Sequence, residues 1–67
     1  MDSKQIDAAM RKRTPVMWRG KQYDRILEYV MFYDNAGKRQ LSVVLLDGRS
    51  SYRVPADEVT EVVNGST

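Results

Sequence analysis

The sequence predicts a small, mainly β domain, in which one short α-helix precedes five antiparallel strands that close into a barrel. The chain has only 67 residues, so it is expected to form one domain. Pro15 separates a helical pattern from β-rich segments, and turn-forming residues divide those segments into short strands. Because an open sheet of this size would expose its edges and half of its core, a closed barrel is expected.

The helix is predicted over residues 3–12. Asp2 and Gln5 have the spacing of a capping box, with Ser3 as an alternative N-cap. Apolar residues then recur at i, i+3 and i+4, which places them on one narrow stripe of the helix. This stripe consists of Ile6, Ala9 and Met10. Because Pro15 lacks an N–H and biases the residue before it away from helix, the helix is expected to end before this proline.

Five segments after the helix have the composition of strands. Tight turns are predicted at Gly20, at residues 34–38 and at the Asp-Gly dipeptide 47–48. Pro55 is expected to end the fourth strand, and residues 56–58 suit one turn of helix before the last strand. The predicted strands are residues 16–18, 23–33, 41–46, 51–54 and 59–63. The second of these is long enough to bend and to belong to both halves of a barrel.

Composition fits a globular domain, with 42% hydrophobic and 30% charged residues. We expect residues 1–13 to form the helical segment, residues 14–63 the barrel and residues 64–67 a flexible tail. No apolar run approaches the length of a membrane span, so no membrane partner is expected. The polar start of the chain lacks the pattern of a secretory signal, and cysteine is absent; both observations predict a cytoplasmic location.

The residue types that carry most catalysis and metal binding are absent. The chain has no His and no Cys, so it lacks the usual acid/base group of neutral pH, thiolate ligands and disulfides. Its acidic residues are scattered, and its four glycines are isolated in turns, so neither a carboxylate pair nor a phosphate-binding loop is predicted. We therefore expect a non-enzymatic chain with no catalytic residue, no metal, no cofactor and no small-molecule substrate.

Both faces of the second and third predicted strands are partly apolar. Since side chains alternate between faces, one set is expected in the core and the other outside. The predicted core set is Ile26, Val30, Phe32, Leu41, Val43 and Leu45. The opposite faces of these neighbouring strands would form one exposed patch, a candidate interface for a protein partner or a second copy. This patch consists of Tyr29, Met31, Tyr33, Val44 and Leu46.

Two alternatives are open for this predicted patch. The apolar stripe of the helix could cover it, because that stripe otherwise has no defined partner within the chain. A β-bulge in the long strand could also shift the register by one residue, which would exchange the two faces.

Basic residues concentrate near the start of the chain. Residues 1–25 hold seven basic and three acidic residues, a balance of +4, whereas residues 26–67 hold four basic and six acidic residues, a balance of −2. Basic residues interleaved with aromatic ones can contact phosphates and stack on bases. The candidates for nucleic-acid contact are Arg11, Lys12, Arg13, Trp18, Arg19, Lys21, Tyr23 and Arg25. Alternatively, residues 11–13 are the solvated end of a helix and Trp18 packs in the core.

The order of the predicted elements resembles the SH3-like small β-barrels. In that fold a helical turn with a Pro near its start links the last two strands, as the segment 54–59 (VPADEV) does here. The resemblance covers residues 15–63 and implies a five-stranded SH3-like antiparallel barrel. A helix before a Pro-Val strand, as in residues 8–16, is also similar to the Sm-like branch, which includes the bacterial Sm-like RNA chaperones. Their Tyr-Lys-His motif aligns loosely with residues 52–54 (YRV), where the His is absent.

Two functions follow as expectations. The first is a non-catalytic module for protein–protein interaction or assembly, which associates through the second and third strands and the helix. The alternative is an RNA- or single-stranded-DNA-binding barrel of the SH3-like or Sm-like type. Salt separates the two, because counterion release makes nucleic-acid binding fall steeply with salt, while an apolar interface does not respond in this way.

Overall fold

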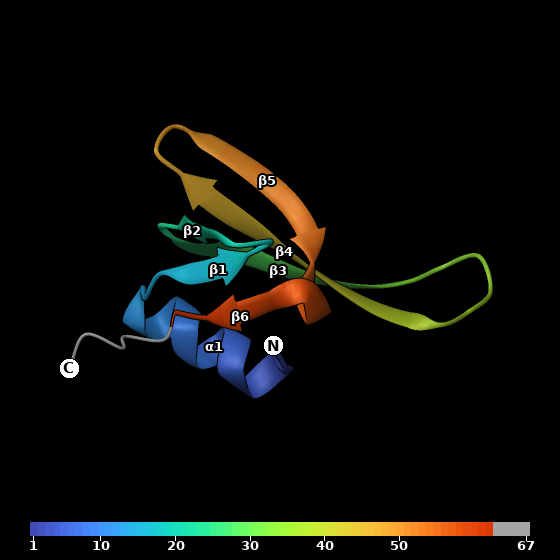
Figure 1. The fold of residues 1–67 in the computed structure, drawn as a ribbon. Helices are drawn as coiled ribbons and strands as arrows, with labels where there is room; N and C mark the ends of the chain where they lie inside the picture. The colour runs from blue at the N-terminus through green and yellow to red at the C-terminus, as the bar shows by residue number, and fades with distance from the viewer. Residues whose placement is uncertain (63–67) are drawn as a thin grey trace.

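The computed structural model describes residues 1–62, and in this range the chain is a mainly β domain with an N-terminal helix (Figure 1). The elements are α1 (Ser3–Lys12), β1 (Val16–Trp18), β2 (Lys21–Tyr23), β3 (Arg25–Tyr33), β4 (Arg39–Asp47), β5 (Ser50–Pro55), the 3₁₀ turn η1 (Ala56–Glu58) and β6 (Val59–Glu61). The predicted helix and the predicted turn before the last strand are both confirmed. The predicted tail, residues 64–67, and residue 63 of the predicted last strand lie outside the described residues.

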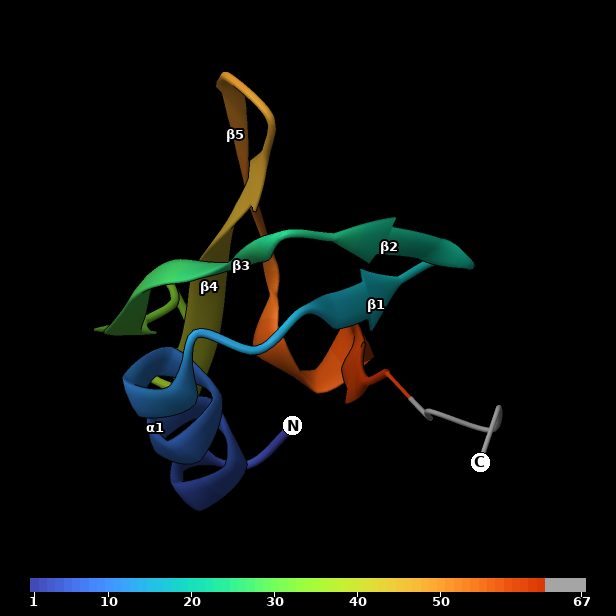
Figure 2. The same cartoon turned by 90° about the vertical axis from the view of Figure 1, so that its left-hand side faces the viewer.

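The strands form two open antiparallel sheets of three strands each. Their orders are β2-β1-β6 and β3-β4-β5, and Figure 2 shows the two sheets crossing one another. The prediction of one closed five-stranded barrel is therefore corrected, because within residues 1–62 no ladder joins β5 to β6. Pro55 ends β5 without an N–H to donate, and η1 then redirects the chain, so β6 pairs with β1 instead.

The predicted long strand is divided between the two sheets at Asp24. The preceding part, β2, pairs with β1, and the following part, β3, pairs with β4. The backbone N–H of Asp24 donates to the carbonyl oxygen of Leu46 at 2.8 Å, and the Asp24 carboxylate accepts the N–H of Gly48 at 2.9 Å. Asp24 thus ties the corner between the sheets to the end of β4 and to the turn after it.

A register shift in β3 changes which side chains face inward. Ile26 lies opposite Leu45, but Glu28 lies opposite Val44, so Leu27 is an additional residue in the ladder. The inward face then passes from even to odd positions. The prediction of Val30 and Phe32 as core residues is wrong for this reason: the Val30 side chain is half-buried and Phe32 is 37% exposed.

The core lies between the two sheets and the inner stripe of α1. The predicted core residues Ile26, Val43 and Leu45 are buried, and the predicted core residue Leu41 is half-buried and packs against them. The buried apolar residues are Ile6, Ala9, Val16, Tyr23, Ile26, Val43, Leu45, Val54, Ala56 and Val59. Most of them are small or aliphatic, and they come from α1, from every strand and from η1. The domain therefore has one core that depends on all of its elements.

The ends of α1 are set by local hydrogen bonds. The N–H of Gln5 donates to Asp2 Oδ1 at 2.8 Å, and the N–H of Asp2 donates to Gln5 Oε1 at 3.0 Å, so the predicted capping box is present. At the other end Arg13 adopts a left-handed conformation, and its N–H donates to the carbonyl oxygens of Ala9 and Met10. Ile6 on the inner face is fully buried, so α1 packs against its own domain.

Truncation of Ile6 is expected to destabilise the domain because it opens a cavity between α1 and the sheets. Ile6→Val should lower the free energy of unfolding by about 0.5–1.5 kcal/mol and Ile6→Ala by about 2–5 kcal/mol, measured by urea denaturation. Lys4→Ala on the exposed face of α1 is the matched control and should stay within about 0.5 kcal/mol. An Ile6→Ala variant as stable as this control would show that α1 does not contribute to the core.

Candidate protein-interaction surface

The last part of β3 and the first part of β4 project from the body of the domain as a hairpin, which we call the arm (residues 28–42). Figure 1 shows the arm extending away from the rest of the domain, with its turn at the far end. The principal extents of the molecule are 43 × 25 × 22 Å, so one dimension is much longer than the others. The arm therefore offers side chains that the core does not use.

Asp34 organises the turn at the tip of the arm. Its Oδ1 accepts the backbone N–H groups of Ala36 and Lys38, each at 2.9 Å, and its Oδ2 accepts the side-chain amide of Gln40 at 3.0 Å. The Asp34 N–H also donates to the carbonyl oxygen of Lys38 at 3.0 Å. The N–H of Lys38 and then the amide of Gln40 hold the pKa of Asp34 below its usual value. These bonds make the arm a preformed structure.

Large apolar side chains are exposed along the arm. Tyr29 is 45% exposed, Met31 44%, Phe32 37% and Tyr33 64%. No charged residue occurs between Glu28 and Asp34. Single exposed apolar residues are ordinary on protein surfaces, but four in five consecutive positions form a patch of the kind that marks an interaction surface.

The five residues predicted to form one patch lie on two different faces. Tyr29 and Met31 lie opposite Val43 and Leu41, so they share the inner face of the sheet, together with Tyr33. Val44 lies opposite Glu28, and both lie on the other face. The bulge in β3 causes this division. The prediction of a single patch is therefore corrected. Tyr29, Met31 and Tyr33 are exposed on one face, whereas Val44 and Leu46 are half-buried on the other.

Phe32 belongs to the exposed surface, although the sequence predicts it in the core. It lies opposite Gln40 on the outer face, and the Arg53 guanidinium lies over its ring at 5.3 Å from the centroid. The arm thus has exposed apolar groups on both faces. The alternative in which α1 covers the predicted patch does not hold for Tyr29 and Met31: Ile6 and Ala9 are buried and α1 contacts β3, yet these two side chains remain nearly half exposed.

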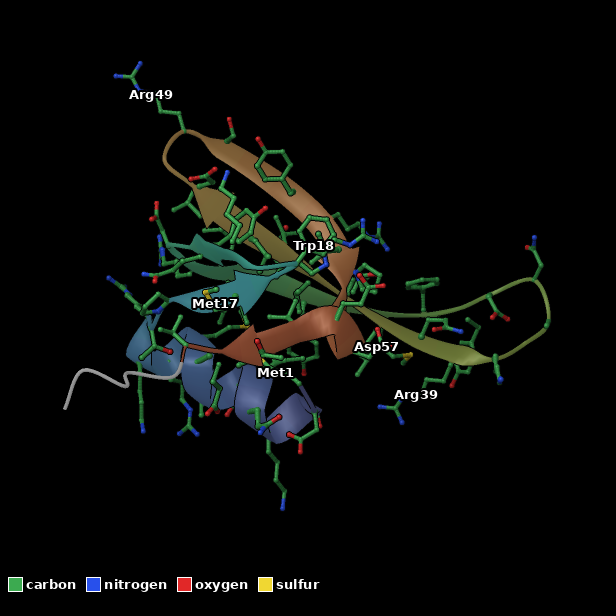
Figure 3. All side chains as sticks on the ribbon, in the orientation of Figure 1. Met1, Met17, Trp18, Arg39, Arg49 and Asp57 are labelled. Atoms are coloured by element: carbon green, nitrogen blue, oxygen red, sulfur yellow. The ribbon has the colours of Figure 1, made fainter. Side chains whose placement is uncertain are left out.

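The aromatic candidates for nucleic-acid contact belong to a cluster between the sheets. The ring centroids of Trp18 and Tyr23 are 6.2 Å apart, and those of Tyr23 and Tyr52 are 6.1 Å apart. Tyr23 is only 5% exposed, so its ring is not available for stacking on a base. The half-buried Trp18, labelled in Figure 3, donates its indole N–H to Glu58 at 3.1 Å. The cluster therefore stabilises the contact between the sheets.

Three of the basic candidates form ion pairs with carboxylates of the same chain. Arg11 pairs with Asp7 at 3.1 Å, Arg19 with Glu58 at 3.3 Å and Lys21 with Asp47 at 2.7 Å. The hydrogen bond from Lys21 to Asp47 raises the pKa of that ammonium group, and the Arg19 guanidinium also lies over the Trp18 ring at 4.8 Å. These pairs reduce the positive charge that the surface offers to phosphates.

The remaining basic candidates lie at the end of α1 and at the start of β3. Lys12 and Arg13 lie exposed at the end of α1, and Arg25 is half-buried at the start of β3 opposite Leu46. Other basic residues point away from the body at separate places, as Arg39 and Arg49 do in Figure 3. The eight candidate residues are therefore spread over the helix end, the β1–β2 turn and the sheet corner.

Further features of the described residues bear on function. Among residues 1–62 no three His, Cys, Asp or Glu side chains lie close enough together to hold a metal ion. None of the helices in this range combines the length and apolar character that crossing a membrane requires. No protein-family model matches the chain, and comparison with curated proteins and with solved structures finds no match either.

The turn bonds predict how Asp34 titrates. Its pKa is lowered in the folded chain, so the stabilisation of the arm is present above the ordinary carboxyl pKa and is lost as pH falls through the folded value. NMR titration should find the pKa of Asp34 below its ordinary value, and Gln40→Leu should raise it. Gln22→Leu, which removes an exposed amide of β2 away from the arm, should leave it unchanged. An ordinary pKa in the unmodified chain would contradict the turn geometry.

Proposed function

We propose that this chain is a non-catalytic β module for protein–protein interaction or assembly, and that the arm is its contact surface. The observation that carries the proposal is the exposure of Tyr29, Met31, Phe32 and Tyr33 on a projecting, preformed hairpin. Such a surface binds at low ordering cost, because the turn at Asp34 already holds the hairpin in shape. Burial of these side chains by a partner would be favourable at about 25 cal/mol per Å² of apolar area.

As part of this proposal, we interpret the fold as an opened SH3-like barrel. Two features support the interpretation: one run of chain, β2 and β3, serves both sheets, and η1 separates the last two strands. The fold alone does not imply a partner, because similar small barrels serve many functions. The choice between functions therefore depends on the arm.

Binding of RNA or single-stranded DNA is the weaker proposal. The basic candidates Arg11, Arg19 and Lys21 are engaged with carboxylates, and Tyr23 is buried. The basic residues that lack such a pair in the described chain include Lys12 and Arg13, next to each other at the end of α1. They would be the contact site if the alternative function holds.

Photo-cross-linking tests the proposed contact surface and does not require the partner to be identified first. A benzoylphenylalanine placed at Tyr33, which is 64% exposed on the arm, should form covalent adducts with protein in the host cell. The matched control is the same group at Tyr52, which is 45% exposed but lies on β5 outside the arm. We expect protein adducts mainly from position 33. Equal adduct formation at both positions, or none at position 33, would overturn the arm as contact surface.

A titration with oligonucleotide tests the alternative function. We expect fluorescence polarisation of a labelled random single strand to show no binding, or only weak binding that Lys12→Ala/Arg13→Ala does not change. Tight binding at low salt that falls steeply with added salt, and that this double variant weakens, would replace the proposed function by nucleic-acid binding. Lys4→Ala/Arg49→Ala is the charge-matched control, because it removes the same number of exposed basic residues elsewhere on the surface.

A further inference from the structure

The outer edge of β3 in the arm carries backbone groups that point away from β4. In an antiparallel ladder, facing residues alternate between pairs that exchange hydrogen bonds and pairs that do not. The N–H of Asp34 donates to Lys38, so these two residues form a hydrogen-bonded pair and the next facing pair, Tyr33 with Arg39, does not exchange hydrogen bonds. Every second pair along β3 repeats this pattern, so Met31 and Tyr29 also lie in pairs without hydrogen bonds to β4. The N–H and C=O groups of Tyr29, Met31 and Tyr33 therefore face outward.

No strand occupies this edge in the described part of the chain. Within residues 1–62, β3 pairs only with β4, and β3 is the outer strand of its sheet. Edge strands are commonly protected by a charge, a proline or a bulge. In this strand the bulge lies at Leu27, before the exposed part, and residues 29–33 contain neither a charge nor a proline. Helix α1 also contacts β3, but Tyr29, Met31 and Tyr33 each remain at least 44% exposed, so this part of the edge is accessible to another strand.

The exposed edge has a symmetrical sequence. Residues 29–33 read Tyr-Val-Met-Phe-Tyr, so an antiparallel copy centred on Met31 places Tyr opposite Tyr and Val opposite Phe. Both are favourable cross-strand pairs. The outward-facing residues are also symmetrical about Met31, so each of the three facing pairs can exchange two backbone hydrogen bonds. A shift of two residues in this register loses one of those pairs.

We propose that the partner of the arm is a second copy of this chain, bound by antiparallel pairing of β3 with β3 about Met31. The inference rests on the proposed function and names the partner. Such an interface is isologous, since the same edge serves both copies, and it extends each three-stranded sheet into one sheet of six strands. It sets Tyr29, Met31 and Tyr33 of the two copies side by side on one face of the extended sheet, and Phe32 beside Val30 of the second copy on the other.

One feature of this pairing opposes it and supplies a test. In the proposed register Glu28 lies opposite Asp34 of the second copy, and Asp34 lies opposite Glu28 of that copy. Like charges directly opposite one another destabilise a strand pair. The turn donors to Asp34 reduce this repulsion without removing it. A change of charge at Glu28 should therefore alter dimer affinity in a predictable order.

Disulfide trapping tests the register, because the chain contains no cysteine of its own. In Met31→Cys the two introduced thiols face each other, at the Cα spacing of about 5.5 Å that suits both the strand pair and a disulfide. We expect a covalent dimer on mild oxidation. Val30→Cys is the matched control. In the proposed register Val30 faces Phe32 of the second copy, so the two introduced thiols are not opposite each other and this variant should remain monomeric on non-reducing electrophoresis. A mixture of Tyr29→Cys and Tyr33→Cys should form a dimer that neither variant forms alone.

Sedimentation velocity of the protein without introduced cysteines tests the charge pair. We expect the unmodified protein to dimerise reversibly with concentration. Glu28→Gln should tighten the dimer and Glu28→Lys should tighten it further, by about fivefold or more in Kd, because two repulsive pairs become attractive. Thr60→Lys adds a positive charge at an exposed position of β6, outside the arm, and should leave the Kd unchanged.

The outcomes separate this inference from the proposed function. A chain that is monomeric at every concentration, with no disulfide-linked dimer of Met31→Cys, overturns strand pairing. If Tyr33 then still cross-links to another protein in the host cell, the arm remains a contact surface with a different partner. Disulfide-linked dimers that form equally with Val30→Cys and Met31→Cys, or a dimer that Glu28→Lys weakens, would also overturn the proposed register.

Discussion

The fold depends on the corner at Asp24, where one continuous run of chain leaves one sheet and enters the other. The backbone of Asp24 is bound to Leu46, and its carboxylate is bound to the N–H of Gly48, so the corner is held against the β4–β5 turn. Because β2 and β3 are fixed relative to each other at this point, the two sheets face one another and the apolar side chains between them become one core. The helix then closes the side of that core with Ile6.

The bulge at Leu27 determines how the arm differs from the body. Before it, Ile26 points into the core opposite Leu45; after it, Tyr29 and Met31 take the inward-facing positions. Those positions lie where the hairpin leaves the body, so the residues face inward without being covered. One additional residue in one strand thus exchanges the side chains that face inward while the hydrogen-bonded ladder continues.

Features that depend on neighbouring residues could be predicted from the sequence, and features that depend on distant ones could not. The helix, its capping box and the turn after Pro55 follow from local patterns, and all three are present. The bulge has no such pattern, because both alternating sets of residues 26–33 contain apolar side chains, and for this reason strict alternation predicts Phe32 in the core. The pair of Arg19 with Glu58 joins residues far apart in the sequence, so the loss of free positive charge near Trp18 could not be predicted either.

The distribution of large apolar side chains shows what the domain lacks when it is alone. Its core is built from Ile, Val, Leu and Ala with a single tyrosine. Three of its six aromatic residues, Tyr29, Phe32 and Tyr33, lie exposed on the arm instead. The buried cluster does not include them, and among the three Phe32 alone has a cation–π contact in the described chain, with the Arg53 guanidinium. Under the proposed function, a bound partner would bury these side chains and so make their exposure in the free domain favourable for binding.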